Sequence, residues 1–277
     1  MRNVVRGVLK LGPLGLSSLV LIAILVFVAV LAPLLATYGP RELAGPRLTP
    51  PDAKYWFGTD SFGRDIFSRL VLGSRLSLYV GLVSTTLGVA GGLTVGVLTG
   101  YLGGKIDLIG QRVIDSMQAF PGLIFALTLM AVLGASVNNV MIAIAVTIIP
   151  GSARIFRSRV LAIKESTFVD AAIALGASDR RIMLLHVLPN MAAIVLIVFS
   201  LDIGRAILTE ASLSFLGLGT PPDVPSWGGM ISLGKKYLVP APWLTLFPGI
   251  AIALTVYAFN LLGDSLRDAL DPKLRGR

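Results

Sequence analysis

Several stretches of twenty or more residues contain few or no charged side chains, and this feature limits the possible fold most strongly. A helix needs about 20 apolar residues to cross the roughly 30 Å hydrocarbon core of a bilayer, because each residue rises only about 1.5 Å. Qualifying stretches cover residues 14–36, 76–103, 116–153, 191–215 and 244–263. The third is long enough for two helices folded back near Gly134 and the pair Asn138 and Asn139. The sequence therefore predicts an all-α, polytopic membrane protein with about six transmembrane helices.

Composition excludes a soluble domain and several kinds of site. Of the 277 residues, 55% are hydrophobic and only 14% are charged, and the mean hydropathy is +0.82, too apolar for a surface in water. Cysteine is absent and histidine occurs once, so we expect no metal and no cofactor bound by this chain. The net charge of +9 is spread between uncharged runs instead of forming one basic face. This pattern predicts contact with membrane lipid and no nucleic-acid partner.

The distribution of Lys and Arg predicts how the chain is oriented. Six spans place both termini on one side, which carries more Lys and Arg than the other side and includes six in the fourth loop: Arg154, Arg157, Arg159, Lys164, Arg180 and Arg181. Positively charged loops remain in the cytoplasm, so we expect a multi-pass protein of the cell (inner) membrane with both termini cytoplasmic. Residues 1–74 would form the N-terminal cytoplasmic tail, the first transmembrane helix and an external loop. Residues 75–277 would form a five-helix core with a cytoplasmic loop over 154–190.

Four glycines repeat at every fourth position of the second span: Gly88, Gly92, Gly96 and Gly100. Residues four apart lie on one helical stripe, so this glycine seam lets another backbone approach closely. The neighbour is either a helix of the same chain or a second subunit.

The fourth loop predicts a small projection from its residues alone. Residues 170–175 favour a short helix that is acidic at its start and ended by Gly176. A second short helix would run over residues 178–187, before Pro189 returns the chain to the membrane. Such a projection suggests docking of a partner protein, and an amphipathic segment lying on the lipid headgroups is the alternative.

The run FVDAAIALGASDRRIMLLHVLPN, residues 168–190, resembles the EAA loop of importer permeases in the ABC (ATP-binding cassette) superfamily. The matching positions are Asp170, Ala171, Ala172, Gly176, Leu188 and Pro189. Asp170 stands where the general motif has Glu and His186 where it has Ile, but the HxLPN ending is similar to the peptide and nickel branch of the family. In that family the loop rests in a groove of the ATPase. The resemblance implies these coupling residues: Asp170, Ala171, Ala172, Leu175, Gly176, Arg180, Arg181, His186 and Pro189.

Five further segments are similar to dipeptide and oligopeptide permeases: FGTDxxGRDxxSRL (57–70), EASLSFLGLG (210–219), PSWG (225–228), PWLTLFPG (242–249) and NLLGDSLRDALDPKLR (260–275). The resemblance implies a type I ABC importer permease fold and translocation of peptides or similar small solutes by alternating access. It also implies three kinds of partner: a second homologous permease in a heterodimer, two cytoplasmic ATP-binding subunits and an external solute-binding protein.

Charged residues in the fifth span and the first loop are candidate functional groups. Asp202, Arg205 and Glu210 lie in the span, where charge is costly, so they should face protein or water. Asp202 and Arg205 are three residues apart and share a helical face; they either form a structural ion pair or line the translocation path, and Glu210 has the same alternatives. In the external loop, Asp60, Arg64 and Asp65 either form an ion-paired plug or meet a delivered solute.

The sequence contains no catalytic machinery. The nearest Walker A candidate, residues 229–236, ends in Lys236 where Ser or Thr must bind magnesium, and His186 has no GxSxG motif nearby. We therefore expect a transport subunit and not an enzyme, with ATP and magnesium bound by partner ATPase subunits. The alternatives are a permease for nickel, glutathione or another non-peptide solute, an ion-gradient-driven secondary transporter, and a scaffold that docks proteins without moving solute.

Overall fold

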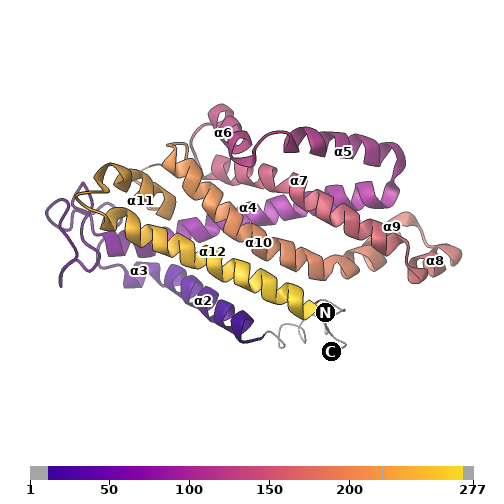
Figure 1. Ribbon diagram of the computed structural model, residues 1–277, viewed down its shortest axis with the longest axis horizontal. Helices are drawn as coiled ribbons and strands as arrows, with labels where there is room; N and C mark the ends of the chain where they lie inside the picture. The colour runs from indigo at the N-terminus through magenta and orange to yellow at the C-terminus, as the bar shows by residue number, and fades with distance from the viewer. Residues whose placement is uncertain (1–11, 220, 222, 271–277) are drawn as a thin grey trace.

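The computed structural model describes residues 12–219, 221 and 223–270, which form an elongated helical bundle (Figure 1). Its five longest spans are α2 (Pro13–Val30), α4 (Ile66–Leu102), α7 (Val137–Lys164), α10 (Leu188–Phe215) and α12 (Trp243–Leu270). The shorter helices are α3 (Ala32–Leu35), α5 (Gly104–Gln118), α6 (Gly122–Leu133), α8 (Thr167–Ala174), α9 (Asp179–Ile182), η1 (Met183–Val187), α11 (Trp227–Gly234) and η2 (Lys235–Tyr237). Among the described residues, the only strand-like pairing is one bridge between Thr59 and Asp65. The all-α prediction is confirmed.

Five helices are long and apolar enough to cross a membrane, and a sixth span exists only if α5 and α6 are counted together. These two helices meet at an angle of 90°, so the third predicted span is a sharply bent pair of helices, and the prediction of about six transmembrane helices agrees with five spans plus this pair. Pro121 ends α5 because proline has no amide donor and disfavours helical geometry in the residue before it. The 12 residues of α6 extend only about 18 Å.

Helices α4 and α7 extend beyond the stretches that the sequence predicts for them. Helix α4 begins at Ile66, ten residues earlier than expected, and Asp65 caps it by accepting a 2.7 Å hydrogen bond from the amide of Ser68. Helix α7 continues to Lys164, so the first part of the predicted loop 154–190 is helical. The cause is periodicity: Phe156, Val160 and Ile163 are buried on one face between the charged residues. The predicted terminal tails, residues 1–11 and 271–277, lie outside the described part of the chain.

The glycine seam of α4 packs against α7 of the same chain, and this settles the alternative left open by the sequence. A Cβ on Gly92 would lie 2.6 Å from the Cβ of Ser152 and 3.0 Å from the backbone nitrogen of Ala153. A Cβ on Gly96 would lie 2.7 Å from the carbonyl oxygen of Ala153 and 2.8 Å from the Cβ of Phe156. Glycine is therefore needed here so that the two backbones can touch.

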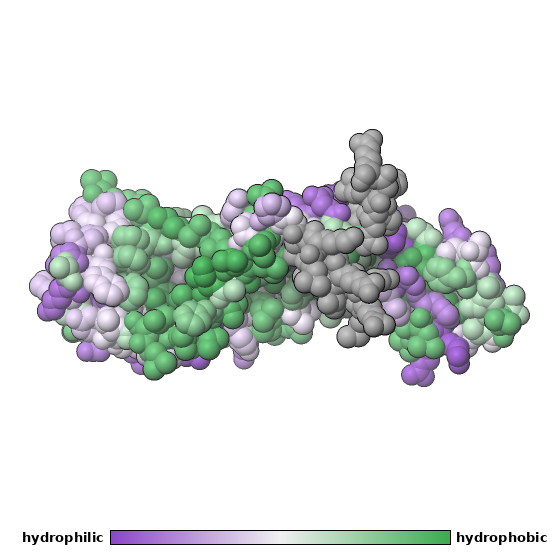
Figure 2. All heavy atoms as spheres, turned by 90° about the horizontal axis from the view of Figure 1, so that it is seen from below, coloured by the Kyte–Doolittle hydropathy of each residue, from purple (hydrophilic) through white to green (hydrophobic). Residues whose placement is uncertain are grey.

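The loops predicted to be external and the fourth loop, predicted to be cytoplasmic, lie at opposite ends of the bundle. The segment before α4 and helix α11 occupy one end, and α8 and α9 occupy the other (Figure 1). Hydrophobic residues cover much of the middle, and hydrophilic residues gather toward the ends (Figure 2). This distribution is the one expected of a bundle that spans a bilayer.

Substituting Gly96 by alanine tests the seam. Gly96→Ala is expected to lower the stability of the purified protein in detergent by about 1–3 kcal/mol, because its methyl group meets backbone and Cβ atoms that cannot move aside cheaply. Gly249→Ala in α12 is the matched control, since no atom lies within 4 Å of its added methyl group. The control should melt at the same temperature or higher, because alanine favours helix. Equal melting temperatures for the two variants would contradict the seam.

Candidate coupling and translocation sites

Residues 165–187 form a compact projection beyond the end of α7. Helix α8 begins at Thr167, three residues earlier than predicted, and has Asp170 in its first turn as expected. Its C-terminal turn closes through Gly176, whose φ of 78° is the left-handed conformation that glycine adopts readily. Val169 and Ala172 are buried against Ile182 in the same hydrophobic cluster. The projection is therefore a folded unit whose buried residues continue the hydrophobic cluster of α4, α7 and α10.

Polar contacts tie the projection to the end of α4. The hydroxyl of Tyr101 donates a 3.1 Å hydrogen bond to Oδ1 of Asp179, at the start of α9. The ammonium of Lys164 donates a 2.8 Å hydrogen bond to the carbonyl of Tyr101 and lies 5.4 Å from the centre of its ring. Tyr101 is buried. The position of the projection is thus fixed by the same helix that carries the glycine seam.

The outer surface of the projection carries large apolar side chains. Leu175 is 89% exposed, and Ile173 and Leu185 are also exposed. Of the sequence-predicted coupling residues, seven are exposed: Asp170, Ala171, Leu175, Gly176, Arg180, Arg181 and Pro189. Ala172 is instead buried in the chain's own core, and His186 is half-buried, with its ring 6.4 Å from that of Phe168. Large exposed apolar side chains of this kind occur at surfaces that contact a partner protein or a membrane.

A wide helical turn that the sequence analysis missed joins the projection to α10. Residues 183–187 form a π-helix, in which the amide of Leu188 bonds to the carbonyl of Met183. Pro189 follows at the start of α10, and the side-chain amide of Asn190 donates a 2.7 Å hydrogen bond to the carbonyl of His186. The second predicted helix therefore runs into the fifth span without a break. In the sequence, the residues that indicate this wide turn are Pro189 and Asn190.

A cavity of about 280 Å³ opens between α7 and α10, next to the start of α6. Its polar lining residues are Thr147, Ser152, Asp202, Arg205 and Thr209. Arg205 Nη1 lies 3.2 Å from Asp202 Oδ1, and the hydroxyl of Ser152 donates a 3.2 Å hydrogen bond to Asp202 Oδ2. The Asp202 side chain is only 8% exposed, whereas that of Arg205 is 75% exposed. The predicted face shared by Asp202 and Arg205 thus lines a cavity.

Glu210 does not share this cavity. Its side chain is buried, and Oε1 accepts a 2.8 Å hydrogen bond from the hydroxyl of Ser214 one turn further along α10. A Cβ on Gly228 of α11 would lie 3.1 Å from its Oε2. The three predicted charges of the fifth span are therefore divided between a cavity and a contact with α11.

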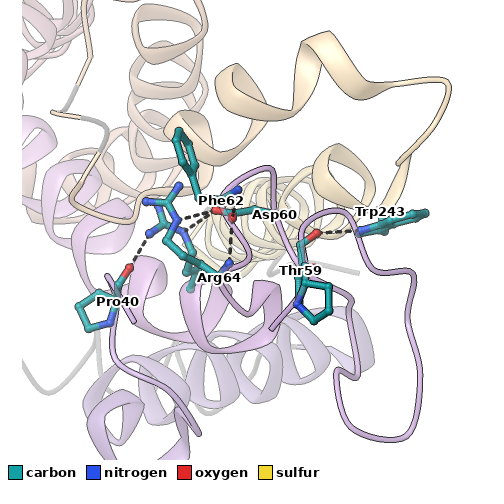
Figure 3. A network of polar contacts seen from close by, with 8 residues as sticks. Pro40, Thr59, Asp60, Phe62, Arg64 and Trp243 are labelled. Carbon is teal, nitrogen blue, oxygen red and sulfur yellow. Dashed lines mark hydrogen bonds and ion pairs between the residues drawn. The ribbon is translucent and has the colours of Figure 1, made fainter. Parts of the chain in front are cut away.

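The first loop folds around Asp60 (Figure 3). Its Oδ1 accepts hydrogen bonds from the amides of Phe62 (2.8 Å) and Arg64 (3.0 Å), and its Oδ2 accepts one from Arg64 Nε (2.6 Å). Arg69 Nε lies 3.9 Å from the same oxygen, and Arg69 Nη1 donates to the carbonyl of Pro40. All three charged side chains are buried. Asp65 belongs to the cap of α4 instead.

Comparison with known proteins identifies the kind of molecule that carries these sites. Residues 92–276, more than half of the chain, match the family of binding-protein-dependent transport system inner membrane components. The chain belongs to this family. It is a multi-pass permease subunit of an ABC importer and not an enzyme, and membership implies an ATPase and a solute-binding protein as partners.

Relatives match the permease over most of its length. It is 44% identical over 268 residues to the dipeptide transport system permease protein DppC of Alkalihalophilus pseudofirmus, covering 96% of this chain and 88% of the relative. It is 46% identical over 225 residues to the glutathione transport system permease protein GsiD of Pectobacterium atrosepticum, covering 81% and 75%. An inward-facing structure of the MetNI methionine ABC transporter shares the fold, with a TM-score of 0.61 and 18% identity over 73% of this chain and 97% of that chain.

Removing Asp60 should strongly destabilise the loop, because the buried Arg64 and Arg69 would lose their shared carboxylate. We expect Asp60→Ala to cost on the order of 3–5 kcal/mol, measured as faster protease cleavage of the first loop and a lower melting temperature in detergent. Asp223→Ala is the control, since it breaks only the exposed ion pair with Arg41, which contributes about 0–1 kcal/mol. Similar cleavage rates in both variants would show that the network does not hold the loop.

Proposed function

We propose that this permease translocates peptides or similar small solutes across the cell membrane by alternating access, driven by ATP hydrolysis on separate subunits. The relatives named for dipeptide and glutathione transport support this solute class. The proposed complex contains a second homologous permease as a heterodimer partner, two cytoplasmic ATP-binding subunits that hold ATP and magnesium, and an external solute-binding protein. In this assembly the described chain binds solute and transmits movement, and it performs no bond chemistry.

The observation that carries the transport role is the exposed guanidinium of Arg205 near the middle of a membrane span. A charge at the centre of a membrane helix costs about 2.5–3.5 kcal/mol. One ion pair with a 75% exposed arginine offsets little of this, because exposed pairs contribute about 0–1 kcal/mol. Arg205 therefore requires water, solute or the partner permease beside it. We propose that the cavity of Asp202 and Arg205 is this chain's part of the translocation path, whereas Glu210 anchors α11.

We propose that the projection is the lever on which the ATPase acts. Its exposed apolar tip around Leu175 offers a contact surface, while Val169 and Ala172 hold its core. Asp170, Ala171, Arg180 and Arg181 would surround the tip. ATP-driven movement of the docked ATPase would shift the spans between two states, in proportion to its different affinity for each state.

The proposed orientation places the projection and both termini in the cytoplasm, in agreement with the Lys and Arg content of that end. The first loop, with Asp60, Arg64 and Asp65, then lies at the outer face as an ion-paired plug. Residues 1–74 would form a peripheral unit beside a core of residues 75–277, although the boundary itself falls inside α4.

Changing the apolar tip tests the lever. Leu175→Asp should leave the fold intact, because the side chain is 89% exposed, but weaken binding of the ATPase subunits by about tenfold or more, since burying a leucine contributes roughly 1.5–3 kcal/mol. ATPase binding to the permease pair and ATP-dependent uptake into vesicles are the measurements. Val239→Asp is the control, because Val239 is 94% exposed and follows α11 and η2, at the opposite end of the bundle from the projection. Equal behaviour of the two variants would refute the docking role.

Thiol labelling tests the path. The chain has no cysteine, so Thr209→Cys introduces its only thiol beside the cavity. A charged, membrane-impermeant thiol reagent should label it in the assembled complex, and the rate should change when ATP is added. Leu254→Cys on the apolar surface of α12 is the control and should react far more slowly. A Thr209→Cys variant that reacts no faster than this control would remove the cavity from the path.

A further inference from the structure

Arg205 has hydrogen-bonding capacity that the described residues do not use. A guanidinium carries five N–H donors, and the contact made by this one is between Nη1 and Oδ1 of Asp202, at 3.2 Å. Asp202 is engaged on both sides, because its Oδ2 accepts from the hydroxyl of Ser152. The carboxylate is 8% exposed and the guanidinium 75% exposed. The guanidinium of Arg205 is therefore exposed at the cavity, whereas the Asp202 carboxylate that pairs with it is buried in the cavity wall.

The hydroxyl groups around Arg205 leave this cation as the dominant feature of the cavity. Thr147 donates its proton to the carbonyl of Ile144 at 2.7 Å, and Thr209 donates to the carbonyl of Arg205 at 2.8 Å. Toward the cavity these hydroxyls offer oxygen lone pairs only. All the residues lining this cavity are described, and Asp202 and Arg205 are the charged ones among them. The exposed member of this charged pair is the positive one, Arg205.

The position of Arg205 along α10 strengthens the electrostatic interactions that its charge can make. Helix α10 runs from Leu188 to Phe215, so Arg205 lies about 5 Å along the axis from the middle of the helix. Electrostatic interactions there are strengthened by the low dielectric of the surrounding protein and lipid. A carboxylate that enters the cavity can accept two parallel hydrogen bonds from a guanidinium.

We infer that Arg205 is the specificity-determining contact for a solute carboxylate in the middle of the membrane, so that the path favours solutes with a free carboxyl group. The inference rests on the proposed transport function. Asp202 positions the guanidinium and competes for it, which keeps the contact strong enough for entry and weak enough for release. The free amino group of a solute meets only hydroxyl oxygens at this point, and it contributes less.

The test uses the complete complex in lipid vesicles, with ATP supplied on the cytoplasmic side. Whichever of Ala-Ala and glutathione the complex imports is compared with its carboxyl-amidated form, in the unmodified protein, in Arg205→Gln and in Arg205→Lys. The ratio between variant and unmodified uptake is compared for the two solutes, so that the effect of the external binding protein cancels. We expect Arg205→Gln to reduce uptake of the free acid about tenfold and to affect the amide little. Arg205→Lys should recover part of the loss.

Protection from thiol labelling gives a second measurement that does not depend on delivery of the amide. In the detergent-solubilised complex with Thr209→Cys, the free acid at high concentration should slow labelling, and the amide should not. Adding Arg205→Gln should abolish this difference.

Equal loss of uptake for both solutes, together with a lower melting temperature, would show a structural ion pair and overturn the inference. Unchanged uptake in Arg205→Gln, or equal protection by acid and amide, would overturn it as well while leaving the transport role intact. Absence of ATP-dependent uptake of either solute by the unmodified complex would refute the proposed function itself, and the carboxylate contact with it.

Discussion

Direct backbone contact between α4 and α7 is the constraint on which both functional regions depend. The glycine seam brings Gly92 against Ser152, and the hydroxyl of Ser152 bonds to Asp202 in the wall of the cavity. At the end of the same helix, Tyr101 bonds to Asp179 and positions the projection. A bulkier seam would separate the helices and disturb both ends of this chain of contacts. The glycine seam thus links the geometry of the cavity to that of the projection.

The charges of Asp60 and Arg205 differ in their number of partners and in their exposure. Asp60 is surrounded by donors, because two amides and two arginines converge on one buried carboxylate. Such a buried network stabilises one arrangement of the loop, although Nη2 of Arg64 is buried without a hydrogen-bond partner among the described residues. Arg205 is open, with one contact to a buried partner and most of its guanidinium exposed. The difference between a structural charge and one available to solute is therefore visible in exposure and in the number of partners.

Hydropathy located the spans, because helices that cross a bilayer need long apolar stretches. It did not locate the end of α7, because that helix continues beyond the apolar stretch as an amphipathic helix. Phe156 and Val160 extend α7 on one buried face, but the arginines between them hide this from an average over residue types. Pro121 marks the bend between α5 and α6, yet the 90° angle between them depends on tertiary packing. The projection was predicted from the residues of the fourth loop themselves, and the family resemblance of residues 168–190 added the expected role. The burial of Ala172 and the separation of Glu210 from Asp202 were not predictable, since one sequence does not say which helices become neighbours.

The π-turn between the projection and α10 sets the rotational phase of everything beyond it. Ile182, Val187 and Met191 are all fully buried in one cluster, although Ile182 and Val187 are five residues apart. In a regular α-helix that spacing would put them about 140° apart around the axis, and the wider π-turn brings them to the same side. One additional residue therefore keeps the projection's core in line with the core of the span. The side of α10 on which Arg205 lies, relative to the projection, is therefore set by the length of that single turn.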